Sequence, residues 1–221
     1  MADVACPAWP TRRSTSNVSP TTWPVNSPGS SVRKRSSGAY LESYTALLRT
    51  ATVKAYLTGN TIRFATDRLT ALAQTKGSIE SPMPEVLFVC EQHADRSQMA
   101  TVLTSALSAG AVHVLVRSAG SAPAHQLNPA VVQVMNELGL DLSEAFPKPL
   151  TDDVLQAADV LITMGCGNAC PIYPGKRYQD WALPDPASLP IEEVRAIRDQ
   201  ITTKVTEMLE LLGVELKGLP A

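Results

Sequence analysis

The fold is decided by the segment Val86-Leu87-Phe88-Val89-Cys90-Glu91-Gln92-His93-Ala94-Asp95-Arg96-Ser97-Gln98-Met99-Ala100. Its first five residues form an apolar run that is typical of a buried parallel strand. A short polar loop follows, and a helical pattern opens at Ser97. A cysteine, five residues, an arginine and a serine therefore lie between the end of a strand and the start of a helix.

The loop between this strand and this helix has the chemistry of an anion-binding site. Backbone N–H groups at a helix N-terminus, with the helix dipole behind them, favour a tetrahedral oxyanion. Arg96 can donate two N–H bonds to that anion, and the same positive field favours the nucleophilic thiolate of Cys90. A free cysteine at a strand end is otherwise an ordinary small buried side chain. The spacing C-x5-R-S in this context favours the anion site.

The composition fits a globular protein without a membrane or nucleic-acid partner. The 221 residues are 44% hydrophobic and 18% charged, which suits one domain with an appendage. Residues 1–37 hold five basic residues against one acidic residue, so their net charge is +4 and the remainder of the chain carries −6. An acidic core of this kind is not expected to bind nucleic acid. No segment is long and apolar enough to cross a bilayer, and the N-terminus lacks a secretory signal.

The cysteines favour a cytoplasmic location. Four are present, Cys6, Cys90, Cys166 and Cys170. They are too few and too unevenly placed for the disulfide framework of a secreted protein, so catalytic or metal-binding cysteines in a reducing cytosol are the better interpretation. A zinc site is disfavoured, because only two clustered sulfurs and no nearby histidine would supply ligands. We therefore expect no metal.

The first 78 residues are expected to form a tail and a helical hairpin. Residues 1–37 are rich in serine, threonine and proline without apolar periodicity, which predicts disorder. In residues 38–78 the apolar spacing predicts one helix from Tyr40 that ends at Gly59-Asn60 and a second from Ile62 that ends before Gly77. The apolar faces of this hairpin must be covered by each other, by the main domain or by a second chain, so a homodimer is left open.

Strands and helices alternate over residues 84–213. This pattern predicts a four-stranded parallel sheet with helices on both faces, an α/β fold. The expected strands are 86–90, 112–117, 160–164 and 177–181, and the expected helices are 97–109, 128–139, 153–158 and 191–212. Ligands of such sheets bind at the carboxyl ends of the strands.

Three candidate catalytic side chains follow the third and fourth strands of this sheet. Cys166 and Cys170 come just after the third strand, and Asp185 follows the fourth. Because parallel strands end at the same edge, these loops and Cys90 are expected to converge.

Five motifs occur in order along this domain. They are Phe88-Val89-Cys90 through Arg96-Ser97-Gln98-Met99-Ala100, Ser118-Ala119-Gly120-Ser121, Asn128-Pro129-Ala130, Ile162-Thr163-Met164-Gly165-Cys166, and Asp180-Trp181 with Asp185-Pro186. Together they resemble the low-molecular-weight protein tyrosine phosphatase superfamily and, within it, the arsenate reductases of actinobacteria. The resemblance covers residues 84–213 and implies a flavodoxin-like topology. It does not cover the tail, and the hairpin is an added element.

The resemblance implies a role for each site residue. Cys90 is similar to the nucleophile, Ser97 to the hydroxyl that holds its thiolate, and Asp185 to the general acid that protonates the departing oxygen. The oxyanion is expected to bind Arg96 and the loop backbone, that is Glu91, Gln92, His93, Ala94, Asp95, Arg96 and Ser97. Cys166 is similar to the resolving cysteine that releases arsenite, and Cys170 could then exchange into a Cys166–Cys170 disulfide.

The reductant and the state of the active loop are left open. The implied reaction needs no tightly bound cofactor but an external thiol, either a thioredoxin-like protein or mycothiol with mycoredoxin. The chain differs from the family loop at His93, where asparagine is usual, and at Asp95, where glycine or cysteine is usual. Histidine tolerates positive φ less readily than asparagine, and a carboxylate beside the anion would weaken its binding. The alternatives are therefore a phosphotyrosine phosphatase and a non-catalytic homologue that binds an oxyanion or a partner.

Overall fold

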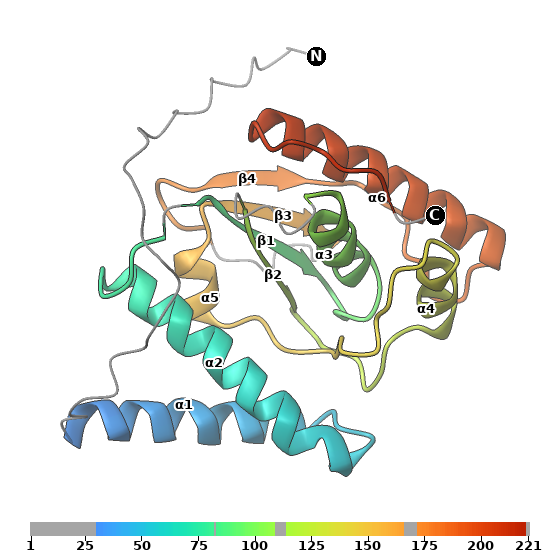
Figure 1. The fold of residues 1–221 in the computed structure, drawn as a ribbon. Coiled ribbons are helices and arrows are strands. Elements are labelled where there is room, and N and C mark those ends of the chain that lie inside the picture. Colours follow the sequence, from blue (N-terminus) through green and yellow to red (C-terminus); the bar gives the residue numbers. More distant parts are fainter. Residues whose placement is uncertain (1–29, 82, 109–113, 166–171, 220–221) are drawn as a thin grey trace.

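The computed structural model describes residues 30–81, 83–108, 114–165 and 172–219. Its centre is a four-stranded sheet in the order β2-β1-β3-β4, in which every neighbouring pair is parallel (Figure 1). The strands are β1 (Glu85–Cys90), β2 (Leu115–Gly120), β3 (Val160–Met164) and β4 (Arg177–Asp180). This arrangement confirms the parallel α/β fold that the alternating pattern predicted.

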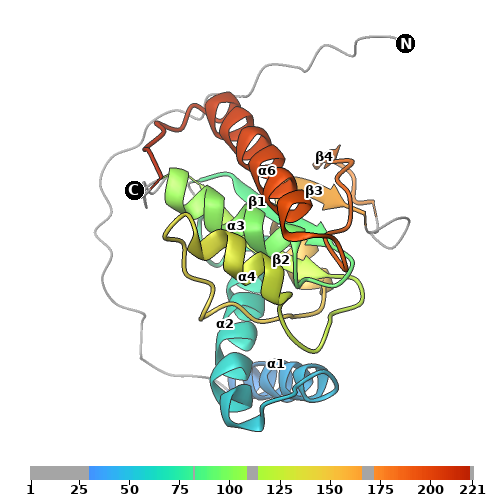
Figure 2. The ribbon, with the colours of Figure 1, turned by 90° about the vertical axis from the view of Figure 1, so that its right-hand side faces the viewer.

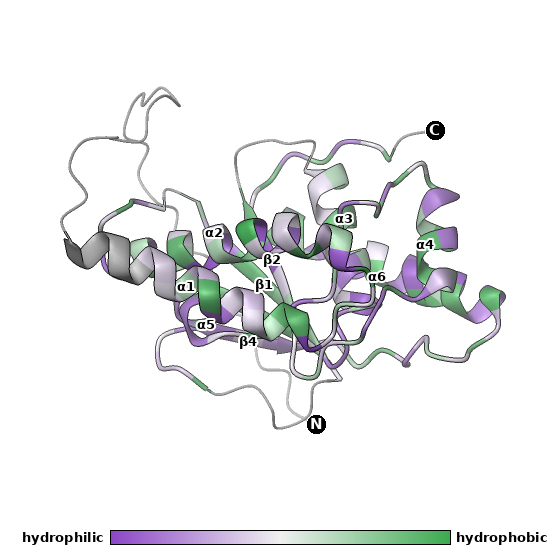
Figure 3. Ribbon diagram, turned by 90° about the horizontal axis from the view of Figure 1, so that it is seen from below, coloured by the Kyte–Doolittle hydropathy of each residue, from purple (hydrophilic) through white to green (hydrophobic). Residues whose placement is uncertain are grey.

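Helices cover both faces of the sheet. On one face lie α3 (Arg96–Leu107), α4 (Pro129–Asn136) and α6 (Ile191–Leu211) (Figure 2), and α5 (Asp152–Ala157) lies on the other. Alternate residues of β1 serve the two cores: Phe88 packs with the first group, and Leu87 packs with α5 and the N-terminal helices. Hydrophobic and hydrophilic residues alternate along α4 and α6 (Figure 3), as expected for helices that cover a sheet.

The second strand differs from its predicted position. β2 runs from Leu115 to Gly120, whereas the apolar run predicted residues 112–117 and a stop at Ser118-Ala119-Gly120. These three small residues continue the parallel ladder, and Gly120 lies opposite Cys90. The ladder with β1 supplies their backbone hydrogen bonds, so tertiary pairing overrides the weak local strand propensity of serine and glycine.

The N-terminal helices also differ from their predicted boundaries. They are α1 (Ser30–Leu48), the short 3-10 helix η1 (Lys54–Tyr56) and α2 (Leu57–Thr75). Residues 30–37 of the predicted structureless tail therefore belong to α1, and residues 1–29 lie outside the described residues. The break between the helices lies at residues 49–53 instead of Gly59-Asn60, which lies inside α2. The β-branched residues of Thr50-Ala51-Thr52-Val53 disfavour the helix more than an isolated glycine does.

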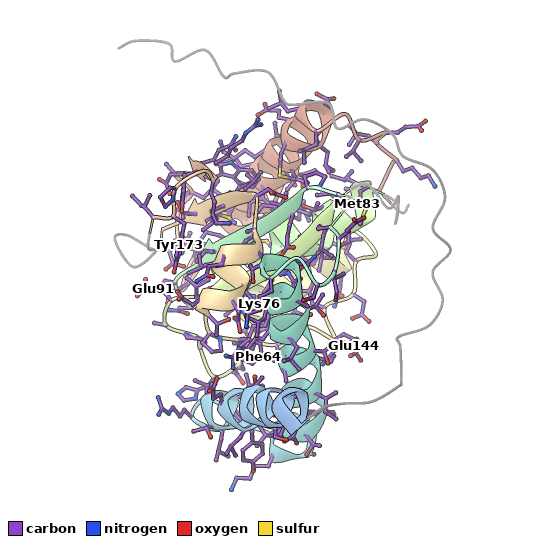
Figure 4. The ribbon with its side chains drawn as sticks, turned by 90° about the vertical axis from the view of Figure 1, so that its left-hand side faces the viewer. Phe64, Lys76, Met83, Glu91, Glu144 and Tyr173 are labelled. Carbon is purple, nitrogen blue, oxygen red and sulfur yellow. The ribbon has the colours of Figure 1, made fainter. Side chains whose placement is uncertain are left out.

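The N-terminal helices are attached to the sheet by buried polar contacts. Arg117 on β2 forms a buried ion pair with Glu85 on β1 and donates to the carbonyl of Asp67 and to Gln74 Oε1 on α2, at 2.7 and 2.9 Å. Phe64, which is 1% exposed, lies near the crossing of α2 and α1 (Figure 4). In the described part of the chain, no helix is long and apolar enough to cross a membrane.

Candidate active site

Cys90 lies at the carboxyl end of the central strand. Its side chain is 1% exposed, and it is the one free cysteine among the described residues. Cys90 Sγ lies 2.9 Å from Ser97 Oγ and accepts the backbone N–H of His93 at 3.2 Å. One group from the loop and one from α3 thus contact the same sulfur.

The loop after Cys90 is held by a second loop at residues 121–128. The carbonyls of Cys90, Glu91, Gln92 and Ala94 accept the N–H groups of Ser121, Ala122, Ala124 and Asn128 at 2.8–3.2 Å. These bonds occupy the carbonyls on one side of the loop. The N–H groups of Gln98 and Met99 donate to the carbonyl of Asp95. The two earlier N–H groups of α3, those of Arg96 and Ser97, precede the first carbonyl of the helix and are available to an anion.

Gly120 lets the two loops approach one another. A Cβ atom at this position would lie 2.7 Å from His93 Cβ and 2.8 Å from the carbonyl oxygen of Glu91. Both distances are shorter than ordinary van der Waals contact, so any side chain here would displace the anion loop. The sequence placed Gly120 in one of the five motifs without this structural role; that role follows from the parallel register that places it opposite Cys90.

His93 adopts the left-handed conformation that its position requires. Its φ is +50°, its side chain is fully buried, and Nδ1 accepts the backbone N–H of Lys148 at 2.8 Å. Burial, and secondarily the charge of Lys148, lower the pKa of His93 well below its ordinary value, so the ring is neutral and its proton is on Nε2. The left-handed backbone costs about 1–2 kcal/mol for a residue with a Cβ.

Side chains that the sequence did not single out support this strained residue. Gln98 Nε2 donates to the carbonyls of His93 and Phe146 at 3.1 and 3.2 Å. Lys148 Nζ pairs with Asp67 Oδ2 on α2 at 2.8 Å, so the N-terminal helices brace the segment that holds His93. Gln98 is part of the motif that includes Arg96-Ser97, but its position in the sequence did not indicate its hydrogen bonds to the carbonyls of His93 and Phe146.

Arg96 and Asp185 meet at the same edge of the sheet. The guanidinium of Arg96 is buried, Nη1 donates to the carbonyl of Leu183 at 3.1 Å, and Nη2 lies 3.6 Å from Asp185 Oδ2. Nε of Arg96 is buried without a partner among the described residues. An oxyanion bound here would satisfy this donor. Gly165 has φ +74°, and a Cβ there would come within 2.8 Å of Arg96 Nη1.

Asp95 is buried rather than directed to solvent. Its side chain is 2% exposed, and Oδ1 has no partner in the described part of the chain. Burial raises the pKa of this carboxyl, a hydrogen bond from Asn128 lowers it, Asp185 raises it and Arg96 lowers it. The net shift is upward, so this carboxyl takes up a proton more readily than a carboxyl at the surface.

The structure brings together most of the predicted site. Cys90, Arg96, Ser97, the loop between them and Asp185 converge on the carboxyl edge of the sheet. The two predicted resolving residues, Cys166 and Cys170, lie outside the described residues. Among the residues described, no group of three or more histidine, cysteine or acidic side chains could hold a metal ion. A thiol, an arginine and a carboxyl at one edge are the types of group that displacement of an oxygen from a tetrahedral oxyanion requires.

Known protein families match two parts of the chain. Residues 85–217 match the low molecular weight phosphotyrosine protein phosphatase family, and residues 39–73 match the protein-tyrosine-phosphatase-like N-terminal domain. A putative arsenate reductase of Halobacterium salinarum is 37% identical over 128 residues, which are 56% of this chain and 89% of that protein. The glutaredoxin arsenate reductase of Synechocystis sp. is 32% identical over 130 residues, 58% of this chain and 97% of that protein.

One solved structure is similar over a longer stretch. The thioredoxin-dependent arsenate reductase of Corynebacterium glutamicum superposes with a TM-score of 0.71 and 44% sequence identity, and the similarity covers 79% of this chain and 84% of that one. This share exceeds the length of residues 85–217, so the similarity extends beyond the catalytic domain.

Proposed function

This chain belongs to the low molecular weight phosphotyrosine protein phosphatase family, and we propose that it acts within that family as an arsenate reductase. The observation that carries the proposal is the 44% identity to a thioredoxin-dependent arsenate reductase over 79% of the chain. The curated relatives quoted above also have this name. The site geometry agrees with the proposal, because a buried sulfur, an arginine with an unpartnered donor and a carboxylate lie at one edge.

The first proposed step is displacement at arsenic. The Cys90 thiolate, held by Ser97 Oγ and the His93 N–H, attacks the arsenic atom and forms a sulfur–arsenic bond. Arg96 and the loop N–H groups hold the remaining oxygens. The bond to the opposite oxygen breaks, and Asp185 protonates this oxygen so that it leaves as water.

The second proposed step reduces the arsenic. A thiolate, which we assign to Cys166, attacks the Cys90 sulfur, and the electron pair of the sulfur–arsenic bond stays on arsenic. Arsenic(V) becomes arsenic(III), arsenite leaves, and the two cysteines become a disulfide. Cys170 then exchanges into a Cys166–Cys170 disulfide. The cytoplasm, a reducing compartment, is the proposed location.

An external thiol must restore the reduced enzyme. One similar protein is a thioredoxin-dependent arsenate reductase and another is a glutaredoxin arsenate reductase. We therefore propose a thioredoxin-like protein as the reductant of this chain, with mycothiol and mycoredoxin as the alternative. Only three residues separate Cys166 from Cys170, and this short separation is the reason to retain a low-molecular-weight thiol as the alternative reductant.

The test is an assay in which the purified full chain is coupled to a reductase, and arsenate-dependent oxidation of NADPH by that reductase is measured. Thioredoxin with its reductase and mycothiol with mycoredoxin and its reductase are supplied in separate assays, and Cys166→Ser is the matched variant. Turnover that needs arsenate, Cys166 and one of these systems supports the proposal.

The second candidate function, phosphotyrosine hydrolysis, needs only Cys90, Arg96 and Asp185, and it stands if neither system responds but a phosphotyrosine analogue is hydrolysed. If both assays fail and Asp95→Gly with His93→Asn restores activity, the chain is a non-catalytic homologue.

Replacing Asp185 by asparagine is expected to lower kcat for arsenate by about 10²-fold, because the amide cannot protonate the departing oxygen. Affinity for phosphate should change much less, since the Arg96 cradle remains. Steady-state kinetics and calorimetric binding of phosphate measure the two effects separately. Asp199→Asn removes an exposed carboxylate on α6 and serves as the control. An unchanged kcat for Asp185→Asn would remove this residue from the mechanism.

A homodimer formed through the N-terminal helices is a further part of the proposal. Leu41, Tyr56 and Ile62 are 64%, 69% and 54% exposed on α1, η1 and α2. Exposed apolar side chains on neighbouring helices favour association with another protein surface. Light scattering of the purified chain should give twice the mass of 23.6 kDa. A monomeric mass at micromolar concentration would contradict this part alone.

A further inference from the structure

Asp95 does not cap α3, although it occupies the N-cap position of this helix. An aspartate at this position normally accepts a backbone N–H of the first turn. Here the side chain makes no such capping bond. The residue is nevertheless only 2% exposed, and Oδ1 of its carboxyl has no hydrogen-bond partner among the described residues. A buried acceptor without a partner costs about 1–3 kcal/mol, so its presence calls for a ligand.

The groups around this carboxyl belong to the anion site. Arg96 and Asp185, which lie 3.6 Å apart, both act on its charge, and the side chain of Asn128 favours its ionised form. The neutral ring of His93 lies two residues before it in the same loop. One cation, one anion and one amide thus influence this buried carboxyl.

A carboxylate in an anion site distinguishes anions by their protons. An ionised carboxyl has only acceptor oxygens, so it repels a bare oxyanion but accepts a hydrogen bond from an oxyanion that has an O–H group. Arsenate and phosphate keep at least one proton at neutral pH, whereas sulfate has none. A site that contains such an acceptor can therefore bind the first two and reject the third.

We propose that Asp95 is a specificity-determining residue that shares one proton with the bound oxyanion, so that the site takes arsenate or phosphate and excludes sulfate. This inference rests on the proposed function, because it assigns the oxyanion to the same loop. It also accounts for an acidic residue in a loop whose other features attract negative charge. The difference from the family at Asp95 then sets anion selectivity and does not inactivate the site.

The pH dependence follows from the shared proton. Above the raised pKa of Asp95 the carboxyl is ionised and opposes sulfate; below it the carboxyl is neutral and its O–H can donate to sulfate. Sulfate affinity should therefore rise as the pH falls. Asp185 is a second carboxyl beside Arg96, so the pH profile must be compared between wild type and an Asp95 variant.

The experiment is calorimetric binding of phosphate and of sulfate to the reduced full chain at pH 7.5 and 5.5. At pH 7.5 the wild type should bind phosphate at least about 10-fold more tightly than sulfate, the factor that about 1.4 kcal/mol supplies. In Asp95→Asn the amide donates to either anion, so this ratio should fall below about 3-fold, mainly through tighter sulfate binding. Lowering the pH should strengthen sulfate binding more in the wild type than in the variant, because only the wild type has a carboxyl at position 95 that can take up a proton.

The control is Glu91→Gln, which removes one negative charge from the exposed end of the same loop. It should change the affinities for phosphate and sulfate by the same factor, because a general charge effect does not depend on whether the anion has an O–H group. Equal binding of the two anions by the wild type, or full selectivity in Asp95→Asn, would overturn the inference and leave the proposed function standing. If neither anion binds the wild type, the anion cradle and the proposed function fail as well. If the variant does not fold, the wild-type pH profile for sulfate decides.

Discussion

Replacing Cys90 by serine is expected to remove arsenate turnover down to the background of the assay, a loss of about 10⁴-fold or more. A hydroxyl stays protonated at neutral pH, whereas a thiol supplies a thiolate nucleophile. Serine is close to cysteine in shape, so the donors around this position, Ser97 Oγ and the His93 N–H, keep a partner. The expected loss is therefore chemical and not structural.

Phosphate binding separates these two causes. The Cys90→Ser variant should bind phosphate with an affinity within a few-fold of the wild type, because the groups of the Arg96 cradle are unchanged. Calorimetry of both proteins measures this, and thermal unfolding checks that the buried serine is tolerated. Residual turnover within 10-fold of the wild type would assign the nucleophile elsewhere, and Cys166 would be the next residue to replace.

The frame of the site was predictable from the sequence because it depends on local patterns. The apolar run before Cys90 predicts a buried strand, and the polar loop with Arg96-Ser97 predicts a helix start. Asp185 could be placed at the same edge because parallel strands end together. The structure places Asp185 3.6 Å from Arg96, and Ser97 2.9 Å from Cys90.

The supports of the site were not predictable, because they are made by residues distant in sequence. Lys148 holds His93 through its backbone N–H, and any residue except proline could supply that group. Asp67 reaches Lys148 from a helix outside the catalytic domain. Local spacing has no information on such pairs. The same reason explains β2, where pairing with β1 and not local propensity decides the end of the strand.

The sequence left open how a carboxyl at Asp95 would affect an anion bound in this loop. A carboxylate in this loop would weaken anion binding if it were ionised and unpaired. The structure encloses it beside Asn128, Arg96 and Asp185, and the net effect is a raised pKa. His93 likewise adopts the positive φ that the loop needs, at a modest cost. Both departures are therefore compatible with an assembled anion loop.

Replacing Gly120 by alanine is expected to lower kcat/KM for arsenate by more than about 10²-fold, although the residue never contacts the oxyanion. Its Cβ would lie 2.8 Å from the carbonyl oxygen of Glu91 and 2.9 Å from the backbone nitrogen of His93. These neighbours are backbone atoms, so the clash cannot be relieved by a change of rotamer and the loop itself must move. The N–H of His93 that contacts Cys90 Sγ moves with it, and displacement of catalytic groups by about 1 Å costs about 10²-fold.

Stability should report the same clash independently. Overpacking of a buried position costs about 1–3 kcal/mol, so Gly120→Ala should lower the free energy of unfolding by this amount in urea titrations. Gly59→Ala is the matched control: Gly59 lies inside α2, and a Cβ atom added there would meet no other atom within 4 Å. That substitution should leave turnover unchanged and raise stability by up to about 1 kcal/mol, since alanine favours a helix over glycine. Wild-type kinetics in Gly120→Ala would mean that the loop can yield without losing its alignment, and the close approach of β2 would then have no part in positioning Cys90.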